Sequence, residues 1–214
     1  LIRRLTAEFR KLVSYGCNLF VSASLSDGPS RQPVLSAEVS RRTGMNIVMC
    51  TGFYVEDEIP SWVEESSVSE VAEFMHRELT QGIGTTGNRC GLIKVSSNSY
   101  GLEKLEKKVF RAASRVHLKT GFPITVHSPK GALPHLDFLV RRGVAPERIA
   151  FAHVEVGPWN DTLEVAKRGG MFVFTNFGGR EWVPEEMIVA QIADLVRRGY
   201  VKRIMISVDM YFTW

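Results

Sequence analysis

Hydrophobic positions along the chain alternate between a spacing typical of strands and a spacing typical of helices. Short runs rich in β-branched and aromatic residues separate longer stretches with a helical period. The strand candidates are Cys17–Ala23, Asn46–Thr51, Gly91–Val95, Ile124–His127, Ile149–His153, Met171–Phe174 and Arg203–Ser207. A helical pattern precedes each run, so we expect a parallel sheet with helices outside. The number of units favours a (β/α)8 barrel over an open sheet.

The predicted helices carry recognisable start and stop signals. Ser67 followed by Glu70 forms a capping-box pattern, which predicts a helix from about residue 68. Apolar residues recur at helical spacing from residue 102 to 116, and Gly121 is a good stop for that helix. Pro184 and Gly199 bracket another helix. His76, His117 and His135 all fall within predicted helices, and we expect them on outer faces.

A short internal repeat relates two of these units. The segments RRGVAPERIAFAHV (141–154) and RRGYVKRIMISVDM (197–210) share a helix end, a glycine and an Arg-Ile strand start. Each has a polar residue ten positions after its glycine, His153 in the first and Asp209 in the second. The repeat therefore places both residues at the carboxyl end of a strand, where barrel enzymes carry their chemistry.

Four polar residues lie at or near the ends of successive predicted strands. These candidate site residues are Lys94, His127, His153 and Asp209. Together they form a set suited to a metal ion. Each also has a simpler explanation. A histidine is often a hydrogen-bonded structural residue, an aspartate a helix cap, and a strand lysine a side chain that reaches solvent from a sheet edge.

Composition and charge exclude several classes of protein. With 214 residues, 44% hydrophobic and 23% charged, the chain resembles an ordinary globular protein, and a single domain over residues 1–214 is the simplest prediction. The 27 basic and 23 acidic residues give a net charge of +4. The basic residues occur in separated pairs, as at Arg141 and Arg142, so we predict no nucleic-acid or membrane partner.

The three cysteines form no C-x-x-C pair, which disfavours a disulfide framework and favours a reducing compartment. No long apolar stretch and no signal peptide is recognisable, so we expect a cytoplasmic protein. GIGTTG (82–87) precedes a strand, the reverse of a dinucleotide-binding fingerprint, and is expected to be a connecting loop. No G-x-S-x-G elbow or P-loop motif occurs.

Several segments carry a family resemblance that extends over nearly the whole chain. They are TGFY (51–54), GIGTTGNRCGLIKVSS (82–97), GFPITVHS (121–128), RIAFAHVE (148–155) and YVKRIMISVDMYF (200–212). In order and spacing, this set resembles the phosphotriesterase family of the amidohydrolase superfamily, which includes the phosphotriesterase-like lactonases. The resemblance implies a (β/α)8 TIM barrel and a metal-dependent hydrolase that acts on ester bonds.

The resemblance also implies a role for each candidate residue. Lys94 would be an N6-carboxylysine whose carbamate bridges two divalent metals, zinc or alternatively cobalt, manganese or iron. His127 and His153 would complete the protein ligands of one metal, and Asp209 would bind the other and accept a proton. A metal-bound hydroxide would attack a small lactone, another ester or an organophosphate. Tyr54 would line the substrate pocket, while Asn176 stands where several lactonases have an arginine.

The sequence departs from the family at both ends. The family carries a His-x-His pair on its first strand, whereas no such pair occurs here, and the sequence ends soon after the last strand candidate. We therefore expect a barrel that lacks its first strand and its C-terminal tail. The alternative to a hydrolase is a non-catalytic relative that binds a small ligand in the barrel mouth. A homodimer is a further expectation that comes from the family alone.

Overall fold

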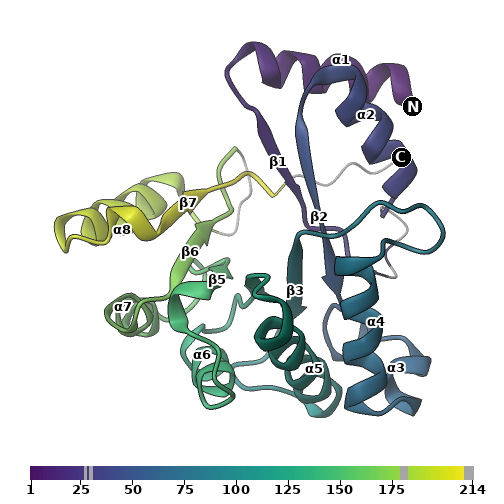
Figure 1. The fold of residues 1–214 in the computed structure, drawn as a ribbon. Coiled ribbons are helices and arrows are strands. Elements are labelled where there is room, and N and C mark those ends of the chain that lie inside the picture. Colours follow the sequence, from purple (N-terminus) through teal and green to yellow (C-terminus); the bar gives the residue numbers. More distant parts are fainter. Residues whose placement is uncertain (27, 29–30, 179–182, 210–214) are drawn as a thin grey trace.

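The computed structural model describes residues 1–26, 28, 31–178 and 183–209, and within them seven strands form one sheet (Figure 1). Each strand pairs in parallel with its neighbour in the chain. The strands are β1 (Leu19–Ser22), β2 (Asn46–Gly52), β3 (Leu92–Ser96), β4 (Ile124–His127), β5 (Ile149–Ala152), β6 (Met171–Phe174) and β7 (Ile204–Ile206). The seven predicted strands and their parallel order are confirmed. The sheet curls into a half-barrel, so the prediction of a barrel holds only in this coarser form.

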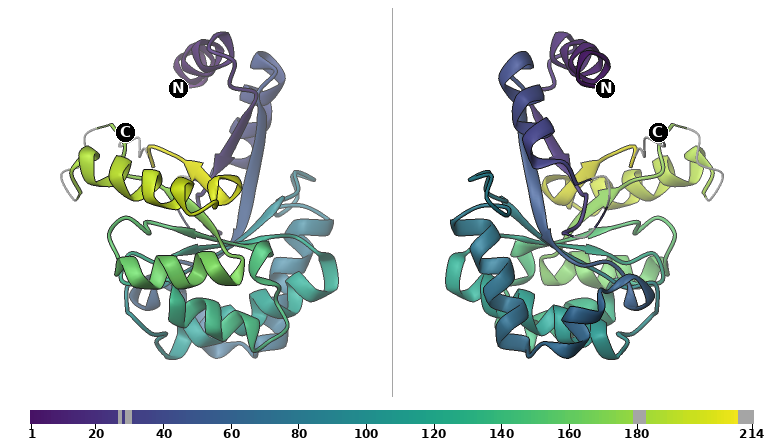
Figure 2. Two further views of the ribbon diagram at one scale, coloured as in Figure 1. Left: turned by 90° about the vertical axis from the view of Figure 1, so that its left-hand side faces the viewer. Right: turned by 90° about the vertical axis from the view of Figure 1, so that its right-hand side faces the viewer.

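Helices alternate with the strands as the sequence pattern predicts. They are α1 (Ile2–Ser14), α2 (Pro33–Thr43), α3 (Ser61–Glu65), α4 (Val68–Thr80), α5 (Lys104–Thr120), α6 (Leu133–Val140), α7 (Trp159–Arg168) and α8 (Glu185–Arg197), with short 3-10 turns at Glu56–Glu58, Pro146–Arg148 and Val201–Arg203. Helices α4 to α7 follow one face of the sheet, while α1 and α2 lie beside β1 and β2 (Figures 1 and 2). None of the described helices is long and apolar enough to cross a membrane.

The predicted helix ends are present in the structure. The Ser67 side chain accepts a hydrogen bond from the Glu70 backbone, and the Glu70 carboxylate accepts one from Ser67, which completes the capping box of α4. Helix α5 ends at Gly121, whose φ of 75° is a left-handed conformation that glycine adopts without strain. The local sequence therefore fixes where these two helices begin or end.

The main hydrophobic core lies between the sheet and its covering helices. Ile93 and Val95 of β3, like Phe172 of β6, are fully buried there. The alternate residues Lys94 and Val173 are only half-buried. Because successive side chains in a strand point to opposite faces, Lys94 lies on the inner face of the curled sheet, away from the helices.

The two ends of the sheet are packed less tightly than its middle. Leu19 and Val21 of β1 are 53% and 47% exposed, and Ile206 of β7 is 62% exposed. Phe9 of α1, Val39 of α2 and Met45 form a small separate hydrophobic cluster. Within the described residues, β1 and β7 each pair on one side only, so both present an open, partly apolar edge.

Candidate metal centre

Lys94 occupies the middle of β3 and points into the half-barrel. Its Nζ donates a hydrogen bond to the Ala23 carbonyl oxygen at 3.2 Å and lies 6.0 Å from the centre of the Tyr54 ring. Loss of solvent around the side chain lowers the pKa of Lys94 from its usual value, while Cys50 and Asp209 oppose that shift. A larger share of the side chain is therefore an uncharged amine than in a lysine on the surface.

Gly52 allows the backbone of β2 to approach Lys94 closely. It pairs with Lys94 in the sheet, and its φ is 131°, in a region that favours glycine. A Cβ atom at this position would lie 1.7 Å from the Lys94 carbonyl oxygen. The glycine of the TGFY segment therefore has a steric role directly beside the candidate lysine.

His127 is the last residue of β4 and shares the inner face with Lys94. It pairs with Ser96, two residues beyond Lys94 on β3, which places the histidine one pleat nearer the strand ends. Its Nε2 lies 2.9 Å from Asn98 Oδ1 and 3.3 Å from the Tyr54 hydroxyl. Burial, helped by the neighbouring His153, lowers the pKa of His127 to about 3. The imidazole is therefore neutral, as a metal ligand must be.

His153 follows β5 and faces His127. The two ring centres are 4.5 Å apart with an interplanar angle of 72°, and His153 Nε2 lies 3.9 Å from Asp209 Oδ2. His153 and Asp209 have φ values of 63° and 42°, unusual for residues other than glycine. The two residues matched by the internal repeat thus share a left-handed backbone that turns each side chain at the end of its strand.

A network behind His153 was not predicted from the sequence. Thr175 Oγ1 lies 2.7 Å from His153 Nδ1 and donates a hydrogen bond to Glu155 Oε1 at 2.9 Å. Glu155 and Asn176, which is joined to it, are 2% and 1% exposed. The only available signal was a carboxylate two positions after His153 in an otherwise apolar stretch, AHVEV.

The donor atoms determine whether these residues suit a metal. No three His, Cys, Asp or Glu side chains are grouped to hold an ion within the part of the chain that the structure describes. The ammonium of Lys94 has no lone pair, whereas a carbamate on the same nitrogen would supply two oxygens. With that change, Lys94, His127 and His153 would offer an oxygen donor and two imidazole nitrogens, because the contacts of His127 Nε2 leave Nδ1 to face a ligand. The Asp209 carboxylate, 3.9 Å from His153 Nε2, would be a further oxygen donor.

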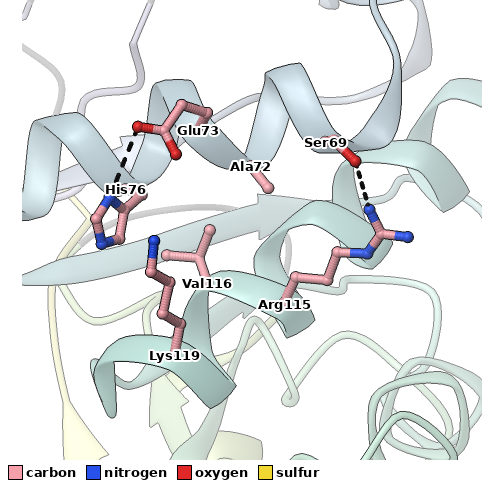
Figure 3. Close-up of a pocket in the computed structure, with 7 residues that line it drawn as sticks. All are labelled: Ser69, Ala72, Glu73, His76, Arg115, Val116 and Lys119. Carbon is pink, nitrogen blue, oxygen red and sulfur yellow. Dashed lines mark hydrogen bonds and ion pairs between the residues drawn. The ribbon is translucent and has the colours of Figure 1, made fainter.

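Two other features lie outside this centre. A hollow of about 180 Å³ between α4 and α5 is lined by Ser69, Ala72, Glu73, His76, Arg115, Val116 and Lys119 (Figure 3). Arg115 donates a hydrogen bond to Ser69 in this hollow, and none of the candidate site residues lines it.

The prediction of outer-facing helical histidines was wrong for His117 and His135. Both are buried: His117 contacts the Phe122 carbonyl that follows its own helix, and the His135 ring packs against Phe110 of α5 and contacts the Gly101 carbonyl.

Nearly the whole chain matches one known protein family. The model of the phosphotriesterase family matches residues 3–213. The chain therefore belongs to the phosphotriesterase family, and the resemblance seen in the sequence is confirmed. A half-barrel of parallel strands with polar residues at the strand ends agrees with this membership.

Individual relatives cover most of the chain. The phosphotriesterase homology protein of Escherichia coli (strain K12) is 34% identical over 177 residues, 81% of this chain and 61% of the relative. A crystal structure of the E. coli phosphotriesterase homology protein, complexed with phosphate in its active site, matches with a TM-score of 0.92 and 29% identity over 98% of this chain and 73% of that one.

Two further relatives carry names that describe an activity. An aryldialkylphosphatase of Saccharolobus solfataricus is 26% identical over 211 residues, 97% of this chain and 67% of the relative. A mutant of a phosphotriesterase-like lactonase from Deinococcus radiodurans matches with a TM-score of 0.90 and 29% identity, over 98% of this chain and 68% of that one. The chain spans about three fifths of the length of the E. coli relative.

Proposed function

We propose that the chain is part of a metal-dependent hydrolase that cleaves a lactone or another ester, with phosphotriesters as a slower side reaction. The observation that carries this proposal is the half-buried lysine of β3, which lies on the same inner face as two histidines and whose pKa is lowered by loss of solvent around its side chain. A neutral amine attacks carbon dioxide to form a carbamate and releases one proton. The product replaces a poorly solvated cation with an oxygen ligand.

The residues of the centre have separate roles in this proposal. The carbamate of Lys94 with His127 and His153 would hold one divalent ion, and the same carbamate with Asp209 would contribute to a second. When bound, such ions activate water as a nucleophile and polarise the substrate oxygen. Asp209 is half-buried and adjacent to His153, so its carboxylate would accept the proton that the attacking water loses.

Tyr54 has a position that supports a role in substrate binding. Its ring lies 5.1 Å from that of His127, and its hydroxyl lies 3.3 Å from His127 Nε2. A substrate bound next to His127 would therefore contact the phenol ring of Tyr54. Names of relatives support both substrate classes, since one is an aryldialkylphosphatase and another a phosphotriesterase-like lactonase. We place the lactone or ester first because the family resemblance implies this preference and one matched structure is a phosphotriesterase-like lactonase.

The decisive test is the replacement Lys94→Ala in protein made from its full reading frame. We expect it to remove bound metal, measured by elemental analysis, and to lower turnover of a lactone and ester panel by several orders of magnitude, since the bridging ligand is lost. Lys108→Ala is the matched control. The Lys108 ammonium donates to the backbone carbonyls of Val63 and Glu64 in α3 and of Ser66 just after it, in the helical layer outside the sheet. Both properties should survive there.

The same measurements separate the hydrolase from a non-catalytic ligand-binding relative. A hydrolase should lose turnover in chelator and recover it with zinc, cobalt or manganese together with bicarbonate. A binding protein would retain affinity for its ligand in chelator and would show no turnover with any metal. Unchanged metal content and turnover in Lys94→Ala would refute the proposed function.

A further inference from the structure

Glu155 is a buried carboxylate that the proposed reaction does not use. It lies two residues beyond His153 and is 2% exposed. Its Oε1 accepts a hydrogen bond from the Thr175 backbone N–H at 2.8 Å, one from the Thr175 hydroxyl at 2.9 Å and one from the Asn176 amide. Three donors converge on one oxygen, so this atom is fixed as an acceptor.

The position of the Thr175 hydroxyl then constrains its single proton. Thr175 Oγ1 lies between Glu155 Oε1, at 2.9 Å, and His153 Nδ1, at 2.7 Å. If the hydroxyl donated to His153, two acceptor oxygens would face each other at 2.9 Å with no hydrogen between them, which is repulsive. The hydroxyl therefore donates to Glu155 and accepts a hydrogen bond from His153 Nδ1–H.

We propose that Glu155 and Thr175 are positioning residues that hold His153 as its Nδ1–H tautomer, so that the Nε2 lone pair faces the metal centre. The role in metal binding rests on the proposed function. The tautomer of His153 does not, because it can be measured in the metal-free protein. An outer partner that fixes the tautomer of a histidine ligand also fixes the plane of its ring.

The arrangement also ties together the segments that follow two strands. Glu155 lies after β5 and Thr175 directly after β6, and Gln191 Nε2 of α8 donates to the Glu155 carbonyl at 3.4 Å. His153 has a left-handed backbone with φ of 63°, so the direction of its side chain is not set by the regular alternation of a strand. The Thr175 hydroxyl, at the end of the neighbouring strand β6 and bonded to Glu155, supplies that direction.

The first experiment reads the tautomer in metal-free protein. Two-bond proton–nitrogen correlation spectra of protein with nitrogen-labelled histidine, recorded in alkaline buffer, show which ring nitrogen carries the proton. His153→Asn assigns the signal. We expect Nδ1–H in the wild type and in Thr175→Ser, which keeps the hydroxyl, and a shift towards Nε2–H in Thr175→Val. Thr125→Val is the matched control, since the Thr125 hydroxyl bonds the Ala150 carbonyl on a neighbouring strand.

The second experiment measures zinc affinity by competition with a chelating dye. Loss of such an outer partner weakens metal binding by roughly 10- to 100-fold, which we expect for Thr175→Val and to a lesser degree for Glu155→Gln, whereas Thr175→Ser should remain near wild type. Nε2–H in the wild type, or an unchanged tautomer in Thr175→Val, overturns the inference. The spectra need no metal, so they test the tautomer of His153 independently of the proposed function. Unchanged metal content and turnover in Lys94→Ala would refute the proposed function and leave the tautomer result valid.

Discussion

The middle of the sheet and its two ends differ in how far their apolar strand residues are buried. Phe172 and Ile124, in the middle, have no exposed surface, whereas Leu19 on β1 and Ile206 on β7 are 53% and 62% exposed. All four are apolar strand residues. The middle strands gain their burial from the covering helices, and the end strands lack a neighbour on one side. Helix cover and strand pairing are therefore separate sources of stability here.

The candidate centre spans both regions. Lys94, His127 and His153 belong to β3, β4 and the end of β5, where the packing is dense, whereas Asp209 follows β7 at an open edge. Three of the four residues are therefore held by a rigid framework, and the fourth depends on the less packed end. We expect the side chains around Lys94 to keep their positions better than Asp209 does when the edges of the sheet are perturbed.

The largest effect should come from truncating an apolar residue in the middle. Phe172→Ala removes a fully buried ring from between the sheet and the helices, so we expect a loss of about 3–5 kcal/mol in the free energy of unfolding. Leu19→Ala at the edge should cost less than about 1 kcal/mol, because much of that side chain already contacts solvent. Urea denaturation of both variants measures the difference. Equal losses would contradict the distinction between the two regions.

An ion pair that joins the two regions should rank next. Arg31 lies after β1 and forms two 2.7 Å contacts with Glu78 of α4, with side chains only 4% and 6% exposed. Arg31→Met leaves a buried carboxylate unpaired and should cost about 3 kcal/mol by urea denaturation. The exposed pair of Arg41 with Glu38 is the control, and Arg41→Met should change stability very little. A small loss for Arg31→Met would mean that the β1 segment is not anchored through Glu78.

A pH effect of intermediate size should come from a buried histidine of the middle region. Burial lowers the pKa of His135 below its usual value, so in mildly acidic buffer the histidine is protonated in the unfolded state and neutral in the folded state. Stability from this group is present above about pH 6.5 and is lost as the pH falls below that value. His135→Gln keeps a donor to the Gly101 carbonyl, and its stability should depend less on pH between neutral and acidic buffers. An unchanged pH profile in His135→Gln would contradict this assignment.

The smallest perturbation is a chemical label. Burial raises the pKa of the Cys50 thiol to about 11 and that of Cys90 to about 12, so almost no thiolate forms at neutral pH. Cys17, beside β1, is only partly buried. Iodoacetamide should therefore modify Cys17 first in the native protein and all three cysteines in denaturant, as read by mass spectrometry. Early labelling of Cys50 would show that the middle region opens readily.

Much of the framework could be predicted from sequence because its signals are local. The strands follow from runs of β-branched residues, and the ends of α4 and α5 follow from Ser67, Glu70 and Gly121. The internal repeat predicted that His153 and Asp209 lie at strand ends, and in the structure they follow β5 and β7. These features depend on a few neighbouring residues, so no knowledge of the packed structure was required.

The missed features depend on contacts between distant parts of the chain. The bond from Thr175 to Glu155 crosses 20 residues, and the pair of Arg31 with Glu78 crosses 47. Nothing near any of these residues indicates its partner. The error for His135 has a similar cause, since the period of a helix does not say how many neighbours will cover it. The roles of Lys94, His127, His153 and Asp209 as metal ligands stay predictions.

Strand order that equals chain order has a consequence for how the protein is made. Each strand finds its partner among the residues synthesised just before it, so pairing requires closure of only one βα loop at a time. Synthesis adds about 5–20 residues each second, which leaves a growing chain ample time to dock one unit before the next emerges. The half-barrel is therefore suited to assembly strand by strand on the ribosome.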